Sequence, residues 1–136
     1  MTARQPSAGG IVLHGPTGGQ RLLVIKRGHP PAQGSWSLPG GRCRPGEPPA
    51  QACVRELAEE TGLQVEVLRL VGRVERAAPG GGVYVIDDFL CRLRGGRLRA
   101  GDDAADARWV DRAQLSGLQL APGLWDALAA WSMLPD

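Results

Sequence analysis

Residues 41–63 read GRCRPGEPPAQACVRELAEETGL, and this stretch predicts the first helix of the chain. Pro48 and Pro49 suit the first turn of a helix, because the N–H groups that proline lacks have no partner there. Gly62 suits the left-handed position that ends a helix. We therefore expect a helix over about 49–61.

Three carboxylates of this predicted helix share one arc. With 100° between successive residues, Glu59 lies about 60° to one side of Glu56 and Glu60 lies about 40° to the other. The neighbouring face is apolar and consists of Ala50, Cys53, Leu57 and Thr61. The helix can therefore pack one face on a sheet and present an acidic face beside it.

The acidic arc has two interpretations. Like charges one turn apart destabilise a helix by a few tenths of a kcal/mol, so solvent or a cation must offset the repulsion. A solvated surface is the ordinary outcome for such a face. Two nearby features favour a cation instead: Gly40 and Gly41 can bring bare carbonyl groups close to an ion, and Glu47 stands where a loop enters the helix. Hard oxygen ligands of this kind suit Mg²⁺ or Mn²⁺.

The part of the chain before this helix predicts a hairpin. Residues 8–14 and 21–26 read as two strands joined by a Gly- and Pro-rich turn. Residues 36–38 read as a short extended piece, and residues 39–41, Pro-Gly-Gly, read as a turn. Residues 1–7 are expected to be loose.

The part after the helix predicts more strands and a last helix. Strands are expected near 65–76, 83–93 and 108–110. Apolar residues at helical spacing after Pro122 predict a final amphipathic helix. This order of elements predicts an α+β fold in which helices cover a mixed sheet.

Size and composition fit one domain over residues 1–136, at 14.4 kDa. With 43% hydrophobic and 22% charged residues, the chain has the balance of a globular protein. Apolar runs are too short for a membrane-spanning helix, and the N-terminus lacks the apolar region of a signal peptide, so cytoplasm is the expected location. A net charge of +2 is too small for a nucleic-acid binder.

The cysteines do not predict a site. Cys43, Cys53 and Cys91 form no CxxC pair, and their number is odd. Neither a disulfide framework nor a zinc site is therefore expected, and reduced thiols are the favoured interpretation.

The glycines, the acidic arc and Glu47 belong to one known family pattern. Gly41, Glu47 and the run from Arg55 to Leu63 fill every fixed position of the Nudix box, GX5EX7REUXEEXGU, in which U is aliphatic. A pattern with so many specified positions is far more specific than a lone glycine motif. The chain thus resembles the Nudix hydrolases. This implies an α/β/α sandwich around a mixed sheet and hydrolysis of a nucleoside diphosphate linked to another group.

The resemblance also implies roles for the residues of the box. Glu56, Glu59 and Glu60 correspond to the ligands of Mg²⁺ or Mn²⁺, with the Gly40 carbonyl as a further ligand. Glu59 and Glu60 are accordingly expected to be catalytic. Arg55, one turn before Glu59, is expected to orient the carboxylates.

Two more residues outside the box are expected at the site. In this family the general base often comes from a later loop, where Asp103 stands, with Asp102 as the second choice. A solvated acidic turn is the alternative for both aspartates. Arg27 resembles a phosphate contact, and an ordinary surface charge is its alternative.

Substrate preference is predicted from positions beyond the box. Pro79 follows Leu63 by sixteen residues, as a proline does in the ADP-ribose pyrophosphatases of the family, so ADP-ribose or a related nucleotide sugar is the expected substrate. A (d)NTP, cleaved to a nucleoside monophosphate and pyrophosphate, is the alternative. A sensor domain that binds nucleotides without turnover is a third interpretation. The complete set of carboxylates in the box disfavours it.

Aromatic residues could hold a base. Trp36 is the first choice for stacking on a base, ahead of Tyr84 and Phe89, with core packing as the alternative for each. The expected partner is a small nucleotide, with neither nucleic acid nor membrane. A homodimer is left open, although the chain departs from the larger ADP-ribose enzymes, which carry an additional N-terminal region used in dimer formation.

Overall fold

The structure is a computed structural model that describes residues 3–30, 32–101 and 104–136. The elements within these ranges follow the chain as β1 (Arg4–His14), β2 (Arg21–Arg27), β3 (Trp36–Ser37), β4 (Gly40–Arg42), α1 (Pro49–Thr61), β5 (Leu63–Ala77), β6 (Val83–Gly96), β7 (Ala104–Val110), α2 (Arg112–Ser116) and α3 (Leu124–Ala130).

The strands form one mixed sheet in the order β3-β2-β1-β6-β5, with β4 added on β1 and β7 on β2. The pair β1 and β6 is parallel, and the other pairs are antiparallel. The first part of β1 pairs with β4, whereas its end pairs with β2. The two halves of the sheet therefore diverge around β1.

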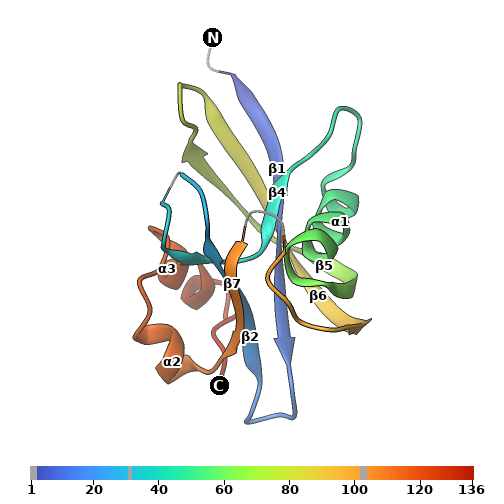
Figure 1. Cartoon of the computed structure of the whole chain (residues 1–136), viewed down its shortest axis with the longest axis vertical. Coiled ribbons are helices and arrows are strands. Elements are labelled where there is room, and N and C mark those ends of the chain that lie inside the picture. The colour runs from blue at the N-terminus through green and yellow to red at the C-terminus, as the bar shows by residue number, and fades with distance from the viewer. Residues whose placement is uncertain (1–2, 31, 102–103) are drawn as a thin grey trace.

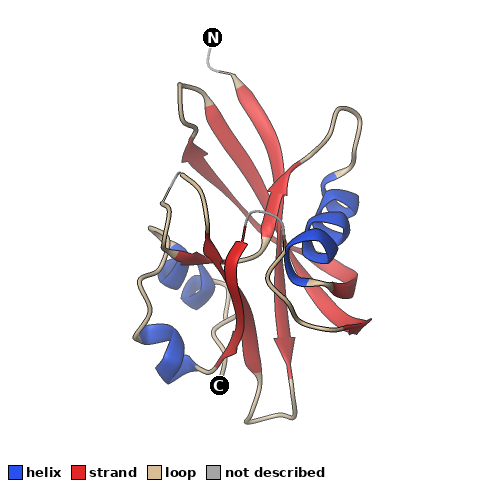
Figure 2. Ribbon diagram, in the orientation of Figure 1, coloured by secondary structure: helices blue, strands red, loops and turns tan. Residues whose placement is uncertain are grey.

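Helices cover both faces of this sheet. In Figures 1 and 2, α1 lies on one side, and α2 and α3 lie on the other. One core cluster packs Leu57 of α1 against Val12 and Phe89, and a second packs Leu115 and Leu128 of the C-terminal helices against the opposite face. The predicted α+β fold, an α/β/α sandwich around a mixed sheet, is confirmed.

Helix α1 has the predicted bounds, Pro49 to Thr61. Its first residue is proline, and Gly62 ends it in the left-handed conformation at φ 74°, donating its N–H to the Ala58 carbonyl. The buried face includes Cys53 and Leu57, as the helical spacing predicts. Among the described residues no helix is both long and apolar enough to cross a bilayer.

Two local predictions are wrong, and one helix was missed. The loose segment predicted for residues 1–7 is not found over residues 4–7, which belong to β1 and pair with β6 and β4. The turn predicted at Gly40 and Gly41 is strand β4, held by β1. Helix α2 was not predicted, although the Asp111 and Gln114 side chains cap it reciprocally.

The predicted reduced thiols agree with the structure, in which all three cysteines are free. Cys53 and Cys91 are buried, with their sulfur atoms 3.6 Å apart, in the core between α1 and the sheet. These two thiols therefore pack as small apolar side chains.

Candidate functional site

Arg55 lies at the centre of the acidic face of α1. Its Nε and Nη2 donate to the two carboxylate oxygens of Glu47 at 2.9 and 2.8 Å. Its Nη1 donates to Glu56 at 2.9 Å and to Glu59 at 3.2 Å, and Nη2 also donates to the Arg42 carbonyl at 3.1 Å. The two-pronged contact with Arg55 lowers the pKa of Glu47 to about 2. One guanidinium thus fixes three carboxylates and ties the helix to β4.

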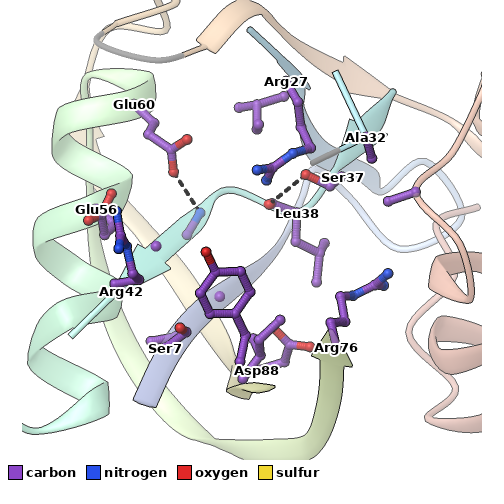
Figure 3. A pocket seen from close by; sticks show the side chains of 18 of the residues that line it. Ser7, Arg27, Ala32, Ser37, Leu38, Arg42, Glu56, Glu60, Arg76 and Asp88 are labelled. Atoms are coloured by element: carbon purple, nitrogen blue, oxygen red, sulfur yellow. Dashed lines mark hydrogen bonds between the residues drawn. The ribbon is translucent and has the colours of Figure 1, made fainter. Parts of the chain in front are cut away.

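Glu60 reaches from the last turn of α1 to β4. Its side chain is buried, with 8% of the residue exposed. The Gly40 N–H donates to Glu60 Oε1 at 2.7 Å, as the dashed line in Figure 3 marks. Glu60 and Gly40, both predicted for the metal site, are therefore neighbours.

Two successive glycines let β4 pass between β1 and the acidic face. A Cβ atom on Gly40 would run into the Ala8 carbonyl oxygen of β1. A Cβ atom on Gly41 would lie 2.5 Å from the carboxyl carbon of Glu56. Burial raises the pKa of Glu56, and the Arg55 guanidinium beside it acts in the opposite direction. The Glu56 carboxylate thus occupies space that only glycine leaves open.

Exchanging each glycine for alanine should separate stability from activity. In Gly41→Ala the conflict is with the flexible end of Glu56, so we expect normal folding and a kcat at least about tenfold lower, because Glu56 is displaced. In Gly40→Ala the conflict is with a backbone oxygen, so we expect a lower melting temperature. Thermal melts and kcat of both variants test this pair. Full activity in Gly41→Ala would show that the position of Glu56 is immaterial.

The donor set of this face fits a divalent cation. Four carboxylates and two guanidinium groups gather here, from Glu47, Glu56, Glu59 and Glu60 and from Arg44 and Arg55. The excess of negative charge and the hard oxygen atoms are what Mg²⁺ or Mn²⁺ requires. In the part of the chain that the structure describes, no three acidic, histidine or cysteine side chains form a ready cation cage.

A cavity of about 1140 Å³ opens beside these carboxylates. Helix α1 and β4 form its acidic wall, which includes Glu56, Glu59 and Glu60, and residues of β1, β5 and β6 form its floor. Arg27, at the end of β2, points into the cavity from the far side (Figure 3). An acidic wall that faces a guanidinium group across a cavity suits a ligand that carries phosphate groups and binds together with a metal ion.

The family model that matches this chain describes the NUDIX domain, over residues 3–131. The chain belongs to the Nudix family. The resemblance found in the sequence is thereby confirmed, and the Nudix box is the segment that forms β4, α1 and the start of β5.

Relatives of this Nudix domain carry two kinds of name. An "ADP-ribose pyrophosphatase" of Methanocaldococcus jannaschii is 39% identical over 101 residues, which cover 72% of this chain and 59% of the relative. A "Putative 8-oxo-dGTP diphosphatase 2" of Mycobacterium tuberculosis is 37% identical over 114 residues, 83% of this chain and 77% of the relative. The Nudix chain thus spans only part of the archaeal protein.

A solved structure shares the fold. The MutT NUDIX hydrolase from Burkholderia pseudomallei superposes with a TM-score of 0.81 and 26% identity, over 93% of this chain and 97% of its own. The arrangement of sheet and helices is therefore that of a Nudix hydrolase.

Trp36 lies in the core of the Nudix domain and not at the cavity. It is 6% exposed and packs in the cluster of α2 and α3. The Arg108 guanidinium covers its ring, 4.9 Å from the centroid. Trp36 is not among the residues that line the cavity, so the alternative of core packing holds, and Phe89 is likewise a core residue.

Pro79 and Asp103 were also predicted at the site. Pro79 is exposed in the turn between β5 and β6 and does not line the cavity. Asp103 lies outside the described residues, as does Asp102. Asp106, on β7, is bound to Arg108 at 3.0 Å.

Part of the cavity floor was not predicted from the sequence. Asp88 is buried at 5% exposed, and Ser7, Arg76 and Asp88 line the cavity together with Tyr84. Burial raises the pKa of Asp88 to about 7. A signal was present, because Asp87 and Asp88 are consecutive acids within the largely apolar run over residues 83–91.

Proposed function

We propose that the chain is a metal-dependent Nudix pyrophosphohydrolase that cleaves the diphosphate of a nucleoside diphosphate linked to a second group, with ADP-ribose as the preferred substrate. The observation that carries this is the complete acidic wall of the Nudix box beside a cavity that Arg27 enters from the other side. The name of the archaeal relative supports ADP-ribose. The exposed position of Pro79 leaves the proline argument without support.

The residues have distinct tasks in this proposal. Glu56, Glu59 and Glu60, with the Gly40 carbonyl, would hold Mg²⁺, or Mn²⁺ in its place. Bound there, the ion neutralises the diphosphate and acidifies a water molecule. Arg55 and Glu47 keep the carboxylates oriented, and Arg27 contacts a phosphate group.

The proton acceptor is assigned to the loop before β7. Asp103 is the proposed base, which takes a proton from the attacking water, and Asp102 is the second choice. Asp106 is a weaker candidate, because its carboxylate is engaged by Arg108. The cytoplasmic location and the homodimer stay predictions.

A substrate panel with Mg²⁺ tests the function. We expect kcat/KM for ADP-ribose to exceed that for dGTP and 8-oxo-dGTP at least about tenfold, equivalent to about 1.4 kcal/mol of transition-state binding. The products should be AMP and ribose 5-phosphate, and ¹⁸O from labelled water should enter a phosphate. The panel should also contain other nucleotide sugars and dinucleoside polyphosphates.

The alternative function is hydrolysis of a (d)NTP to a monophosphate and pyrophosphate, which the name of the mycobacterial relative favours. A higher kcat/KM for the triphosphates would establish it and reject the ADP-ribose preference. Label in the sugar would reject attack on phosphorus altogether. Binding of nucleotides without turnover would indicate that the chain is a sensor domain and not an enzyme.

A further inference from the structure

The floor of the cavity carries a buried carboxyl group that the Nudix box does not include. Asp88 of β6 pairs with Gly9 of β1, and a Cβ atom on Gly9 would run into Asp88 Oδ1. The missing side chain of Gly9 thus makes the room that Asp88 occupies. The next residue, Gly10, faces α1, since its Cβ would lie 2.8 Å from Leu57 Cδ2. Because successive residues of a strand point to opposite faces, Asp88 lies on the face away from α1.

Asp88 and its neighbour Asp87 differ in their partners. Asp87 accepts from Arg73 Nε at 2.6 Å and from Nη2 at 3.3 Å. Among the described residues, no side-chain hydrogen bond or ion pair engages Asp88, although only 5% of the residue is exposed. No fully buried side-chain oxygen in the described ranges lacks a partner, so the oxygens of Asp88 keep contact with the cavity. The Arg76 guanidinium on β5 acts on Asp88 through its charge, and the carboxyl oxygens keep their hydrogen-bonding capacity for a ligand in the cavity.

The side chains around Asp88 line one part of the cavity, which is called the slot below. On β6, every second residue points to the face that Asp88 occupies, so Tyr84 and Ile86 share this face. The residues paired with Tyr84, Ile86 and Asp88 on β5 are Arg76, Val74 and Gly72, in that order. Gly72 leaves room for the Trp131 ring that follows α3. Leu38 and Pro122 also line the cavity. The slot therefore combines aliphatic side chains with an aromatic ring, a guanidinium group and a carboxyl group.

Such a slot suits a flat heterocycle. Aromatic and aliphatic walls bind the faces of a base, and a carboxyl group accepts from an N–H at its edge. The diphosphate belongs at the opposite end of the cavity, where Arg27 and the carboxylates of α1 lie. Figure 3 shows this separation, with Glu56 and Glu60 on one side and Asp88 and Arg76 below.

We propose that Asp88 sets the base specificity of the enzyme by accepting a hydrogen bond from the exocyclic amino group of adenine. This inference rests on the proposed function. Hypoxanthine carries a carbonyl oxygen where adenine carries its amino group. At a pH above about 7, where Asp88 is ionised and can only accept, the lone pairs of that oxygen would face those of the carboxylate, so the test is made in this range. A site built around one hydrogen-bonding group rejects the analogue that lacks it.

The test compares ADP-ribose with its hypoxanthine analogue, inosine diphosphate ribose. In the unmodified chain, we expect kcat/KM to favour ADP-ribose at least about tenfold. In Asp88→Asn, the side-chain amide can donate to the hypoxanthine oxygen, so the ratio should fall to about one. Asp87→Asn is the matched control, because it removes a neighbouring charge on the opposite face and should keep the ratio.

Calorimetric binding of AMP and IMP gives a second measurement that does not need turnover. The unmodified chain should bind AMP more tightly, and Asp88→Asn should lose this preference. Equal binding by the unmodified chain overturns the role of Asp88, even if the variants fail to fold. A preference that survives in Asp88→Asn overturns it as well. If no diphosphate is hydrolysed but the AMP preference follows Asp88, the proposed function fails and the base site stands.

Discussion

Replacing Glu60 with glutamine is expected to lower kcat about 10²- to 10³-fold while the fold survives. Glutamine keeps the shape, and its side-chain oxygen can still accept from the Gly40 N–H that Glu60 binds at 2.7 Å. What the variant loses is one negative charge at the wall where the ion is proposed to lie. Steady-state kinetics with Mg²⁺, together with a thermal melt, give the two quantities needed.

Glu66 supplies the matched control for this experiment. It lies on β5, half exposed, 3.6 Å from Arg92, and it does not line the cavity. Glu66→Gln should therefore retain full activity. Unchanged kcat in Glu60→Gln, or activity that EDTA does not abolish, would refute the assignment of α1 as the metal-binding helix.

The second large effect is expected at Arg55. Its guanidinium contacts Glu47, Glu56 and Glu59, and 17% of the side chain is exposed. In Arg55→Gln these carboxylates lose their shared partner, so the melting temperature should fall by on the order of 5 °C. Activity should fall about tenfold or more, because the carboxylates are no longer oriented. Arg55→Lys should recover part of the charge but not the two-pronged contact.

The pH dependence of stability adds a check on this pair. The pKa of Glu47 is about 2 in the folded chain, below its ordinary value of 4.5. A carboxyl group whose pKa is lowered by folding stabilises the fold at pH values above its ordinary pKa. This stabilisation is lost as the pH falls toward 2. In Arg55→Gln this acid-dependent component should shrink. An Arg55→Gln variant with the original acid profile would show that another group holds Glu47.

The fold was predictable where local chemistry and final structure agree. Pro49 and Gly62 mark the ends of α1 by their own backbone preferences, which do not depend on distant partners. Strand β4 was not predictable from its glycines, because glycine disfavours strands and β1 alone holds it extended. The start of β1 was missed for the same reason. Arg4 and Pro6 become strand residues only through pairing with Val83 and Val85.

The site divides in the same way. The acidic wall is local, since helical spacing alone brings Glu56, Glu59 and Glu60 to one face. The floor is not local, because Asp88 reaches the cavity only through its pairing with Gly9 across the sheet. Trp36 was expected at the site because it lies close to Gly40 in the sequence. The sequence does not reveal that Trp36 packs in one core cluster with residues of α3.

The parallel pairing of β1 with β6 also bears on how the chain folds. During synthesis β1 emerges first, and its neighbour β2 follows at once, but β6 is made only after α1 and β5. Contacts between such distant segments form slowly, because the entropy of closing the long loop is lost before the contact forms. Until then the edge of β1 from Arg4 to Val12 has open backbone groups that can pair with another chain. The edge of β1 that later pairs with β6 is thus open to misassembly in the nascent protein.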